Sequence, residues 1–330
     1  MDSETIAQVI DVLQRYVFNV ANLQGMLRLA TPIVLAGLCA LITSRAGIMN
    51  IAGEGMILFG AWFAVAGSYF FESALAGIVA AVLSGLVVGG LFALFSLKFR
   101  AHIIIMGIAI NIFANAATIF LTRAVFKQAG GFADPRIVGL GPIDIPIIKD
   151  IPILGPVLSG YTIIVYITWI LVVLTMVFLY RTPWGLHLRA VGEQAQAAET
   201  LGINVQRIRF AAVMASGVFA SLAGVYLSLG HLKMYTDQMA AGRGFIGMAV
   251  NTFGGGEPIG VFLSSLLFGL VSTVGWRLQG ERLVPVYFID MLPYLATLVA
   301  LTLFTLRRKR AQKAALALNE SNGENGETQG

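Results

Sequence analysis

The chain has 330 residues, of which 57% are hydrophobic and only 12% are charged, and its formal net charge is +5. A soluble domain carries about 25% charged residues, so this composition excludes an ordinary soluble protein and indicates a membrane protein. The single cysteine, Cys39, excludes an intrachain disulfide framework, and the three scattered histidines provide no zinc-binding spacing.

The first segment, residues 1–25, has apolar residues at helical spacing from Ile6 to Val20, with Asp11 and Arg15 between them. This pattern predicts a helix lying on the membrane surface, and an ordinary packed helix fits it equally well. The segment lacks a basic region followed by a short apolar core and a cleavage site, so we expect no removable signal peptide.

Eight long apolar runs follow, and each approaches the roughly 20 residues that a helix needs to cross a hydrocarbon core of about 30 Å. Only helices or a closed barrel satisfy the backbone in lipid, and these runs are too long for barrel strands. The sequence therefore predicts an all-α polytopic bundle over residues 26–306. The runs are Leu29–Ser44, Gly55–Phe71, Ala74–Leu97, Ile103–Thr122, Tyr161–Tyr180, Ala211–Gly230, Pro258–Trp276 and Pro285–Leu306.

The basic run Arg307–Arg310 directly follows the last apolar run, which predicts a cytoplasmic C-terminus and a polar, disordered tail over 307–330. Counting back, residues 181–209 form a cytoplasmic loop and residues 123–160 an external loop. One further, short crossing between Arg243 and Gly256 gives about nine crossings, with a range of 8 to 10, and an external N-terminus.

Two Gly-rich stretches interrupt the apolar pattern, "RAGIMNIAGEG" from Arg45 to Gly55 and "RGFIGMAVNTFGGGEP" from Arg243 to Pro258. Paired interruptions of this kind predict two broken-helix pseudo-repeats that meet near a substrate path. Asn50, Glu54 and Asn251 can satisfy freed backbone amides or face a polar solute. Capping of helices near the headgroups is the alternative for these side chains.

Asn111 and Asn115 are four residues apart in an otherwise apolar run, and so share one helical face. Together with Asn50, Glu54 and Asn251, they are our candidates for the substrate path. Uncharged amides suit a neutral hydroxylated solute. Hydrogen bonding between helices is the alternative role of such amides in a bundle.

The predicted cytoplasmic loop contains a polar stretch, Gln196–Gly202, of helix-forming residues closed by a glycine at the expected C-terminal cap. One or two turns of helix are marginally stable alone, so we expect this helix to pack against something. Small residues at Ala197 and Ala198 would let it sit closely in a partner's groove. An ordinary connecting turn is the alternative.

At this stretch the chain resembles a known family. Two alanines, three residues and Gly202 resemble the motif by which permeases of ABC importers contact their ATPase, although Gln196 stands where a glutamate is usual. Gly192–Glu193 before it and Gly202–Val205 after it are similar to the version in permeases for branched-chain amino acids, simple sugars and nucleosides. Three other stretches agree with that family: "SRAGIMNIAGEGMILFGA" (44–61), "GIAINIFA" (107–114) and "IPILGPVL" (151–158).

The resemblance implies a type II ABC importer-like fold and a permease subunit for a nucleoside or simple sugar in a bacterial-type inner membrane. Its implied partners are a second permease, as a copy or a homologue, cytoplasmic ATPases and an external binding protein. The ATPase-coupling residues that it implies are Gly192, Glu193, Ala197, Ala198, Thr200, Leu201 and Gly202. Two departures concern the position of His102, where an acidic or amide residue is expected, and Gln194–Ala195, which replaces a common Asn-Pro.

No Gly-x-x-x-x-Gly-Lys-Ser/Thr motif occurs in the chain, so ATP and Mg²⁺ are expected on the partner ATPase, with no catalytic residue, cofactor or metal here. Prolines stiffen the external loop 123–160, which would offer the binding protein a preformed surface; a merely solvated connection is the alternative.

A secondary transporter or channel that works alone remains the rival function. It would leave the coupling pattern unexplained and would usually show buried carboxylates. A membrane enzyme is a second rival, but Asp290 in the last run is the only acid there and no catalytic set accompanies it.

Overall fold

The computed structural model describes residues 20–143 and 159–280. The chain divides into two units, Met1–Val274 and Gly275–Gly330, and the account below concerns the first. The described part of the second unit is the end of one helix, residues 275–280. Most of the predicted surface helix, the run Pro285–Leu306 and the tail 307–330 lie outside the described residues.

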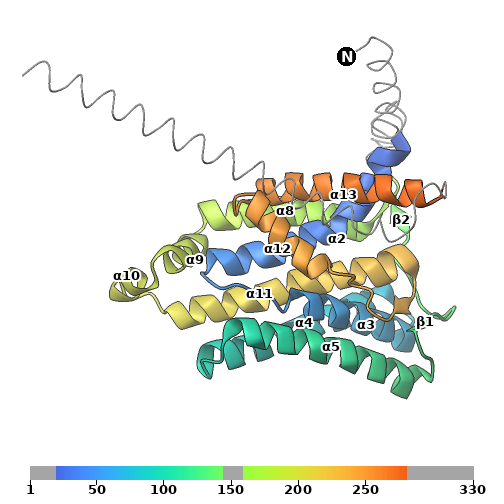
Figure 1. Ribbon diagram of the computed structural model, residues 1–330, viewed down its shortest axis with the longest axis horizontal. Helices are drawn as coiled ribbons and strands as arrows, with labels where there is room; N and C mark the ends of the chain where they lie inside the picture. Colours follow the sequence, from blue (N-terminus) through green and yellow to red (C-terminus); the bar gives the residue numbers. More distant parts are fainter. Residues whose placement is uncertain (1–19, 144–158, 281–330) are drawn as a thin grey trace, which may run out of the picture. The chain divides into compact units, whose positions relative to one another are not determined.

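The first unit is built from helices joined by short segments, with two small sheets (Figure 1). The helices are α2 (Val20–Arg45), α3 (Gly53–Phe71), α4 (Ala74–Ala93), α5 (Ile103–Phe126), α8 (Ile163–Arg181), α9 (Pro183–Glu193), α10 (Ala195–Thr200), α11 (Val205–Val225), α12 (Arg243–Phe253) and α13 (Pro258–Gly280), which continues into the second unit. Two π-helical turns, η1 (Leu94–Lys98) and η2 (Tyr226–Leu232), extend α4 and α11. In the sheets, β1 (Gly131–Phe132) pairs with β4 (Tyr235–Thr236), and β2 (Pro142–Ile143) pairs with β3 (Tyr161–Thr162), both antiparallel.

Seven helices in the described ranges are long and apolar enough to cross a membrane. They coincide with the first seven apolar runs and confirm the prediction of a helical, polytopic membrane protein. Helix α2 begins at Val20, so the predicted boundary at residue 25 falls inside the first membrane helix. The total number of crossings and the internal repeats stay predictions.

Small residues bring the central helices α3, α4 and α11 into close contact. A Cβ atom on Gly60 of α3 would lie only 2.5 Å from the Cα of Ser221 in α11, and one on Gly89 of α4 would lie 3.1 Å from the Val213 carbonyl oxygen. Lipid tails are as apolar as leucine, so membrane helices associate through such close packing rather than through a hydrophobic driving force. Helices α5 and α8 instead expose large apolar side chains, including Ile112, Phe120 and Val173.

Most of the segment 181–209, which the sequence predicts as a cytoplasmic loop with one short helix, is helical. Pro183 occupies the first turn of α9, and the Thr182 side chain accepts a hydrogen bond from the Gly185 amide at 3.1 Å. The Asn204 side chain accepts one from the Arg207 amide at 2.9 Å and so caps α11. Both caps satisfy amides that a helix start leaves free, which is why helix resumes so soon after each break. Arg207 and Arg209 therefore lie in the first turns of a membrane helix.

The short helix α10 lies at one end of the first unit, and strands β1 and β2 lie at the other (Figure 1). We call these the α10 end and the strand end. At the strand end, Arg136 contacts the Tyr69 hydroxyl, and its guanidinium lies over the Tyr69 ring at 4.2 Å. The hydrogen bond from Arg136 lowers the pKa of the Asp134 carboxyl below its usual value. Part of the predicted external loop, residues 144–158, lies outside the described residues.

Candidate substrate path and coupling segment

The segment between α2 and α3, residues 46–52, turns back along the bundle after α2 ends. Near its start, the Ala46 carbonyl accepts a hydrogen bond from Arg209 Nε at 3.2 Å. Further on, the Asn50 amide donates to the Ser216 hydroxyl at 2.9 Å. Arg209 and Ser216 are seven residues apart on α11, which corresponds to about 10 Å along a helix. We call residues 46–52 the returning segment; it carries the start of α3 into the interior of the bundle.

The N-termini of α3 and α12 meet where the returning segment ends. Glu54, in the first turn of α3, accepts hydrogen bonds from the amides of Gly242 and Gly244, both at 2.7 Å. These amides belong to the start of α12, so one carboxylate caps the second broken helix from the first turn of the first. A helix N-terminus carries free N–H groups and a partial positive charge, which a carboxylate neutralises.

Asn111 of α5 forms hydrogen bonds with the backbone groups that the break before α3 leaves without helical partners. Its carbonyl oxygen accepts a hydrogen bond from the Gly55 amide, and its amide donates to the Ile51 carbonyl, both at 2.8 Å. The side chain therefore bridges the two ends of the one backbone hydrogen bond, from the Gly55 amide to the Ile51 carbonyl, that an unbroken helix would make. This geometry is the interhelical bonding that the sequence left as the alternative for this residue.

Asn115 lies one turn further along α5 and has a different environment. Its carbonyl oxygen is buried and accepts no hydrogen bond from any residue that the structure describes. The two asparagines share a helical face as predicted, but only Asn111 is tied to the returning segment.

Asn50 and Asn251 line one cavity of about 540 Å³ between α2, the returning segment and α12. Asn50 is 4% exposed, and its own side chain also accepts a hydrogen bond from the Ala52 amide at 3.0 Å. Asn251 donates to the Ser44 hydroxyl at 3.0 Å, whereas its buried carbonyl oxygen has no hydrogen-bond partner among the described residues. The cavity is lined by Ala40, Ser44, Gly47, Ile48, Met49, Asn50, Met248, Ala249, Asn251 and Thr252. No charged side chain lines it.

A second cavity of about 670 Å³ lies on the other side of the returning segment. Gly47 and Met49 line both cavities, and Met49 is 60% exposed. The second cavity has basic side chains in its wall, Arg100, His102 and Arg209. His102, where the sequence departs from the family pattern, stands at the N-cap of α5 and makes no side-chain capping bond there.

The returning segment is fixed at the α10 end by three neighbours. Arg45 Nε donates to the Gly256 carbonyl at 2.6 Å, beyond α12, and Arg209 holds Ala46 from α11. The third neighbour is Gly192 of α9, whose Cβ, if present, would lie 2.8 Å from the Arg45 carbonyl carbon and 3.2 Å from the Gly47 amide nitrogen. A predicted coupling residue thus contacts the segment that lines both cavities.

Helix α10 confirms the predicted short helix. Gly202 follows it with φ +80°, and the amides of Gly202 and Ile203 donate back to Glu199 at 2.9 Å and Ala198 at 3.1 Å. Nothing lies within 4 Å of where a Gly202 Cβ would be, so the left-handed backbone alone favours glycine here.

Only one side of α10 faces the bundle. Ala198 is 2% exposed and packs into the core beside Ile208 of α11. Glu193, Ala197 and Thr200 are exposed, and Leu201 is 80% exposed. A large apolar side chain presented to solvent beside small residues suits a helix that docks into a groove of another protein.

Sequence reasoning missed several residues of this region. Arg45 and Arg209 served only as charges flanking apolar runs, whereas both donate to backbone carbonyls of the interrupted stretches. For Arg45, the position directly beside a Gly-rich break could have indicated this role. Ser216 gave no signal, because a serine in an apolar helix most often bonds its own backbone.

Comparison with known proteins gives consistent matches. Residues 22–304 match the family model described as the permease component of the branched-chain amino acid transport system. The chain is 32% identical over 309 residues to the nucleoside ABC transporter permease protein NupC of Lactococcus lactis, covering 89% of this chain and 93% of NupC. It is 35% identical over 292 residues to the guanosine ABC transporter permease protein NupQ of Bacillus subtilis, covering 83% and 88%.

Among solved structures, the chain is similar to the inward-facing conformation of a metal-chelate type ABC transporter. The TM-score is 0.50 at 14% identity, with 91% of this chain and 89% of the other chain covered. At this identity the likeness concerns the fold alone. It is consistent with the fold of an ABC transporter permease.

Proposed function

Because the chain belongs to the branched-chain amino acid transport system permease family, we propose that it is the membrane-spanning subunit of an ATP-driven ABC importer for nucleosides. Two similar permeases, at 32% and 35% identity, carry nucleoside or guanosine in their names. The observation that carries the substrate class is the cavity between α2 and α12, which is large, polar in part and uncharged. A ribonucleoside has hydroxyl and amide-like groups and no charge, so amides and hydroxyls are its suitable partners. A simple sugar has the same chemistry and is the competing substrate.

In this proposal the cavity is one half of the substrate path, and Asn251 offers the substrate a hydrogen-bond acceptor. Its buried carbonyl oxygen has no hydrogen-bond partner in the described ranges, so a passing hydroxyl could donate to it. Asn50 lines the same cavity, whereas Asn111 and Glu54 act beside the path by bonding backbone groups at the two helix breaks. Asn115 also belongs to the proposed path, because its buried carbonyl oxygen has no hydrogen-bond partner in the described ranges either.

The α10 end is the cytoplasmic end in this proposal. Four arginines near it, Arg45, Arg181, Arg207 and Arg209, follow the positive-inside tendency. Helix α10 docks in a cytoplasmic ATPase, which supplies ATP and Mg²⁺, and its motion reaches the returning segment through Gly192. A second permease completes the path and an external binding protein delivers substrate at the strand end. With α12 too short for a full crossing and a further span over 285–306, the count of about nine crossings stands as part of the proposal.

Uptake tests the proposed function. A bacterial strain that lacks the chain is compared with the same strain carrying it, using tritiated guanosine or adenosine with unlabelled competitors. We expect ATP-dependent uptake only with the chain present, with competition by nucleosides and none by ribose or leucine. Chain-dependent uptake of tritiated ribose, with no uptake of the labelled nucleosides, would make the substrate a sugar. Uptake that survives ATP depletion would instead indicate a self-sufficient transporter.

The path assignment has its own test. Asn251→Ala is expected to raise the KM for nucleoside uptake by about tenfold, since one hydrogen bond to a buried polar group is worth roughly 1.4 kcal/mol. Thr252→Ser, which keeps the hydroxyl at the neighbouring wall position, is the control and should change KM little. An unchanged KM in Asn251→Ala would remove this residue from the path.

A further inference from the structure

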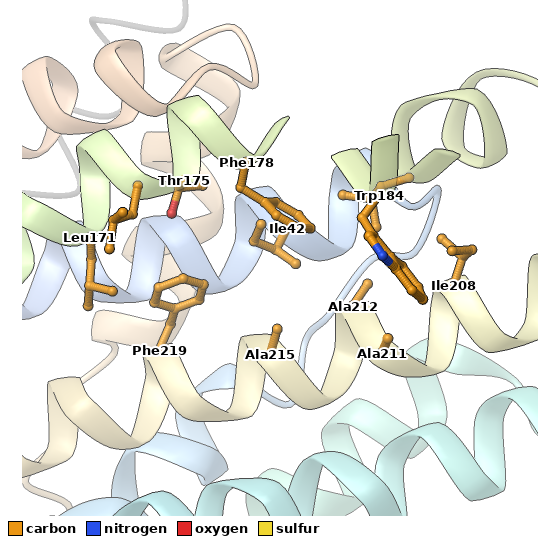
Figure 2. Close-up of a pocket in the computed structure, with 12 residues that line it drawn as sticks. Ile42, Leu171, Thr175, Phe178, Trp184, Ile208, Ala211, Ala212, Ala215 and Phe219 are labelled. Carbon is orange, nitrogen blue, oxygen red and sulfur yellow. The ribbon is translucent and has the colours of Figure 1, made fainter. Parts of the chain in front are cut away.

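An apolar pocket of about 400 Å³, open on one side, lies between α8 and α11 at the α10 end (Figure 2). It shares no lining residue with the two polar cavities. Phe178 of α8 and Ala215 of α11 face each other across it, and Ile42 of α2 lies between them. Trp184 of α9 reaches across one end, and Phe219 lies at the other (Figure 2). Thr175 is the only lining residue with an aliphatic hydroxyl, and no charged side chain contributes to the wall.

The dimensions of the pocket decide what can fill it. Its lining runs along α11 from Ile208 to Phe219, which is about 16 Å of helix, close to one leaflet's half of the roughly 30 Å hydrocarbon core. A volume of 400 Å³ over that length leaves a cross-section of roughly 25 Å². A helix with its side chains is about 10–12 Å across and needs roughly 80–110 Å². The pocket therefore has room for one extended hydrocarbon chain and cannot enclose a whole helix.

The mouth of the pocket has the chemistry of an anionic headgroup site. Arg181 ends α8 one turn after Phe178, and Arg207 precedes Ala211 by one turn of α11, so both lie on the faces that form the pocket. Both arginines are exposed, and neither forms an ion pair with a carboxylate in the part of the chain that the structure describes. Trp184, 63% exposed, stands beside them, and tryptophan favours the membrane–water interface.

We propose that this pocket binds one anionic phospholipid, with an acyl chain between α8 and α11 and the phosphate near Arg181 and Arg207. The acyl chain would fill the space between α8 and α11, over α2, that the side chains of the described residues leave empty. The neighbouring surface of α8 exposes Val173 and Leu174 to the bilayer, so the chain can enter sideways from lipid. The site does not depend on the transported solute, and it would stand if the proposed function failed.

Native mass spectrometry of the full chain in mild detergent tests the site, with phosphatidylglycerol and phosphatidylcholine of identical acyl chains as probes. We expect one retained phosphatidylglycerol per chain and weaker retention of phosphatidylcholine. Ala215→Leu, which fills the pocket, should abolish retention of either lipid. Val173→Leu on the open face of α8 is the matched control and should retain both.

The headgroup site is tested by Arg181→Gln combined with Arg207→Gln. Two surface arginines near anionic lipid predict a loss of phosphatidylglycerol affinity of about tenfold or more, which removes its preference over phosphatidylcholine. Lys98→Gln, an exposed cation at the end of η1, is the charge-matched control and should keep the preference.

A second measurement keeps the proposal testable if Ala215→Leu fails to fold. Phosphatidylglycerol with brominated acyl chains should quench the fluorescence of intact protein more than that of Trp184→Phe. Equal quenching in the two proteins, or equal lipid retention by the filled and intact chains, would overturn the site. Disulfide formation between two copies carrying Leu174→Cys would also overturn it, because a second permease would then cover the pocket.

Discussion

The returning segment and helix α10 are neighbours at one end of the molecule, and they are held in opposite ways. Polar groups of the returning segment are bonded within the chain, to Arg209, Asn111 and Ser216. Helix α10 buries little more than Ala198 and leaves Leu201 in solvent. A segment stabilised by its own bundle keeps its shape without partners, whereas an exposed docking helix needs a partner to be stabilised. Gly192, in the helix that precedes α10, packs against the backbone of Gly47 and so links the two regions.

The largest effect is expected from Glu54→Ala, which removes both acceptors from the start of α12. Two hydrogen bonds to a charged group are worth about 3 kcal/mol or more, and the freed amides stay buried. We expect a strong fall in thermal stability in detergent and loss of uptake. Glu72→Gln, at the exposed C-terminal end of the same helix, is the control. Normal stability in Glu54→Ala would show that α12 does not need its carboxylate cap.

Asn111→Ala compared with Asn115→Ala separates support from transport. Asn111→Ala should cost about 2 kcal/mol, because an unsatisfied amide and carbonyl remain at the start of α3. Asn115→Ala removes a carbonyl without a hydrogen-bond partner in the described ranges, so its stability should change little. Thermal unfolding of the two variants measures the difference, and equal losses would contradict the account. A raised KM in Asn115→Ala alone would support its place in the substrate path.

Gly192→Ala tests the junction between the two regions. Its new methyl group would press on the backbone at Arg45, and such overpacking costs about 1–3 kcal/mol. We expect ATPase binding to persist and uptake to fall, because the junction and not α10 is altered. Measured ATP hydrolysis without uptake would be the signature of broken transmission. Parallel loss of ATPase binding would mean that the residue supports α10 itself.

Gly202→Ala should have the smallest effect. The left-handed backbone costs a residue with a Cβ about 1 kcal/mol, and no atom lies within 4 Å to clash. A slight fraying of α10 and a modest fall in ATPase affinity are expected. Gly202→Asn, which tolerates this backbone better, should behave closer to the intact chain. Complete loss of ATPase binding in Gly202→Ala would give the glycine a direct role at the interface.

Much of the fold follows from apolar run length, because each of the seven helices that are long enough to cross a membrane coincides with a continuous apolar run. The position of the breaks was also predictable, because Gly and Asn residues interrupt the apolar pattern at both of them. The bonds across the breaks were not predictable. Glu54 bonds an amide 188 residues away, and Arg45 a carbonyl 211 residues away, so only the packed bundle brings these groups together.

The candidate site shows the same limit at closer range. Spacing placed Asn111 and Asn115 on one face, but it could not show that only the first meets the returning segment. Helix α9 and the start of α11 were missed because their caps, Thr182 and Asn204, stand in a polar stretch between two apolar runs that was assigned as a loop by counting crossings. Thr and Asn are preferred N-cap residues, so the sequence contained a signal for both helix starts that the prediction did not use.

Co-purification of an ABC ATPase with this permease tests the central claim most directly. The intact chain and a version with residues 193–202 scrambled around an unchanged Ala198 are solubilised from the same membranes, with equal amounts of permease recovered. The account predicts that an ATPase accompanies the intact chain and is absent with the scrambled one, while both chains unfold at similar temperatures. An ATPase retained by the scrambled chain would contradict the role of α10, and no ATPase with either chain would contradict the importer itself.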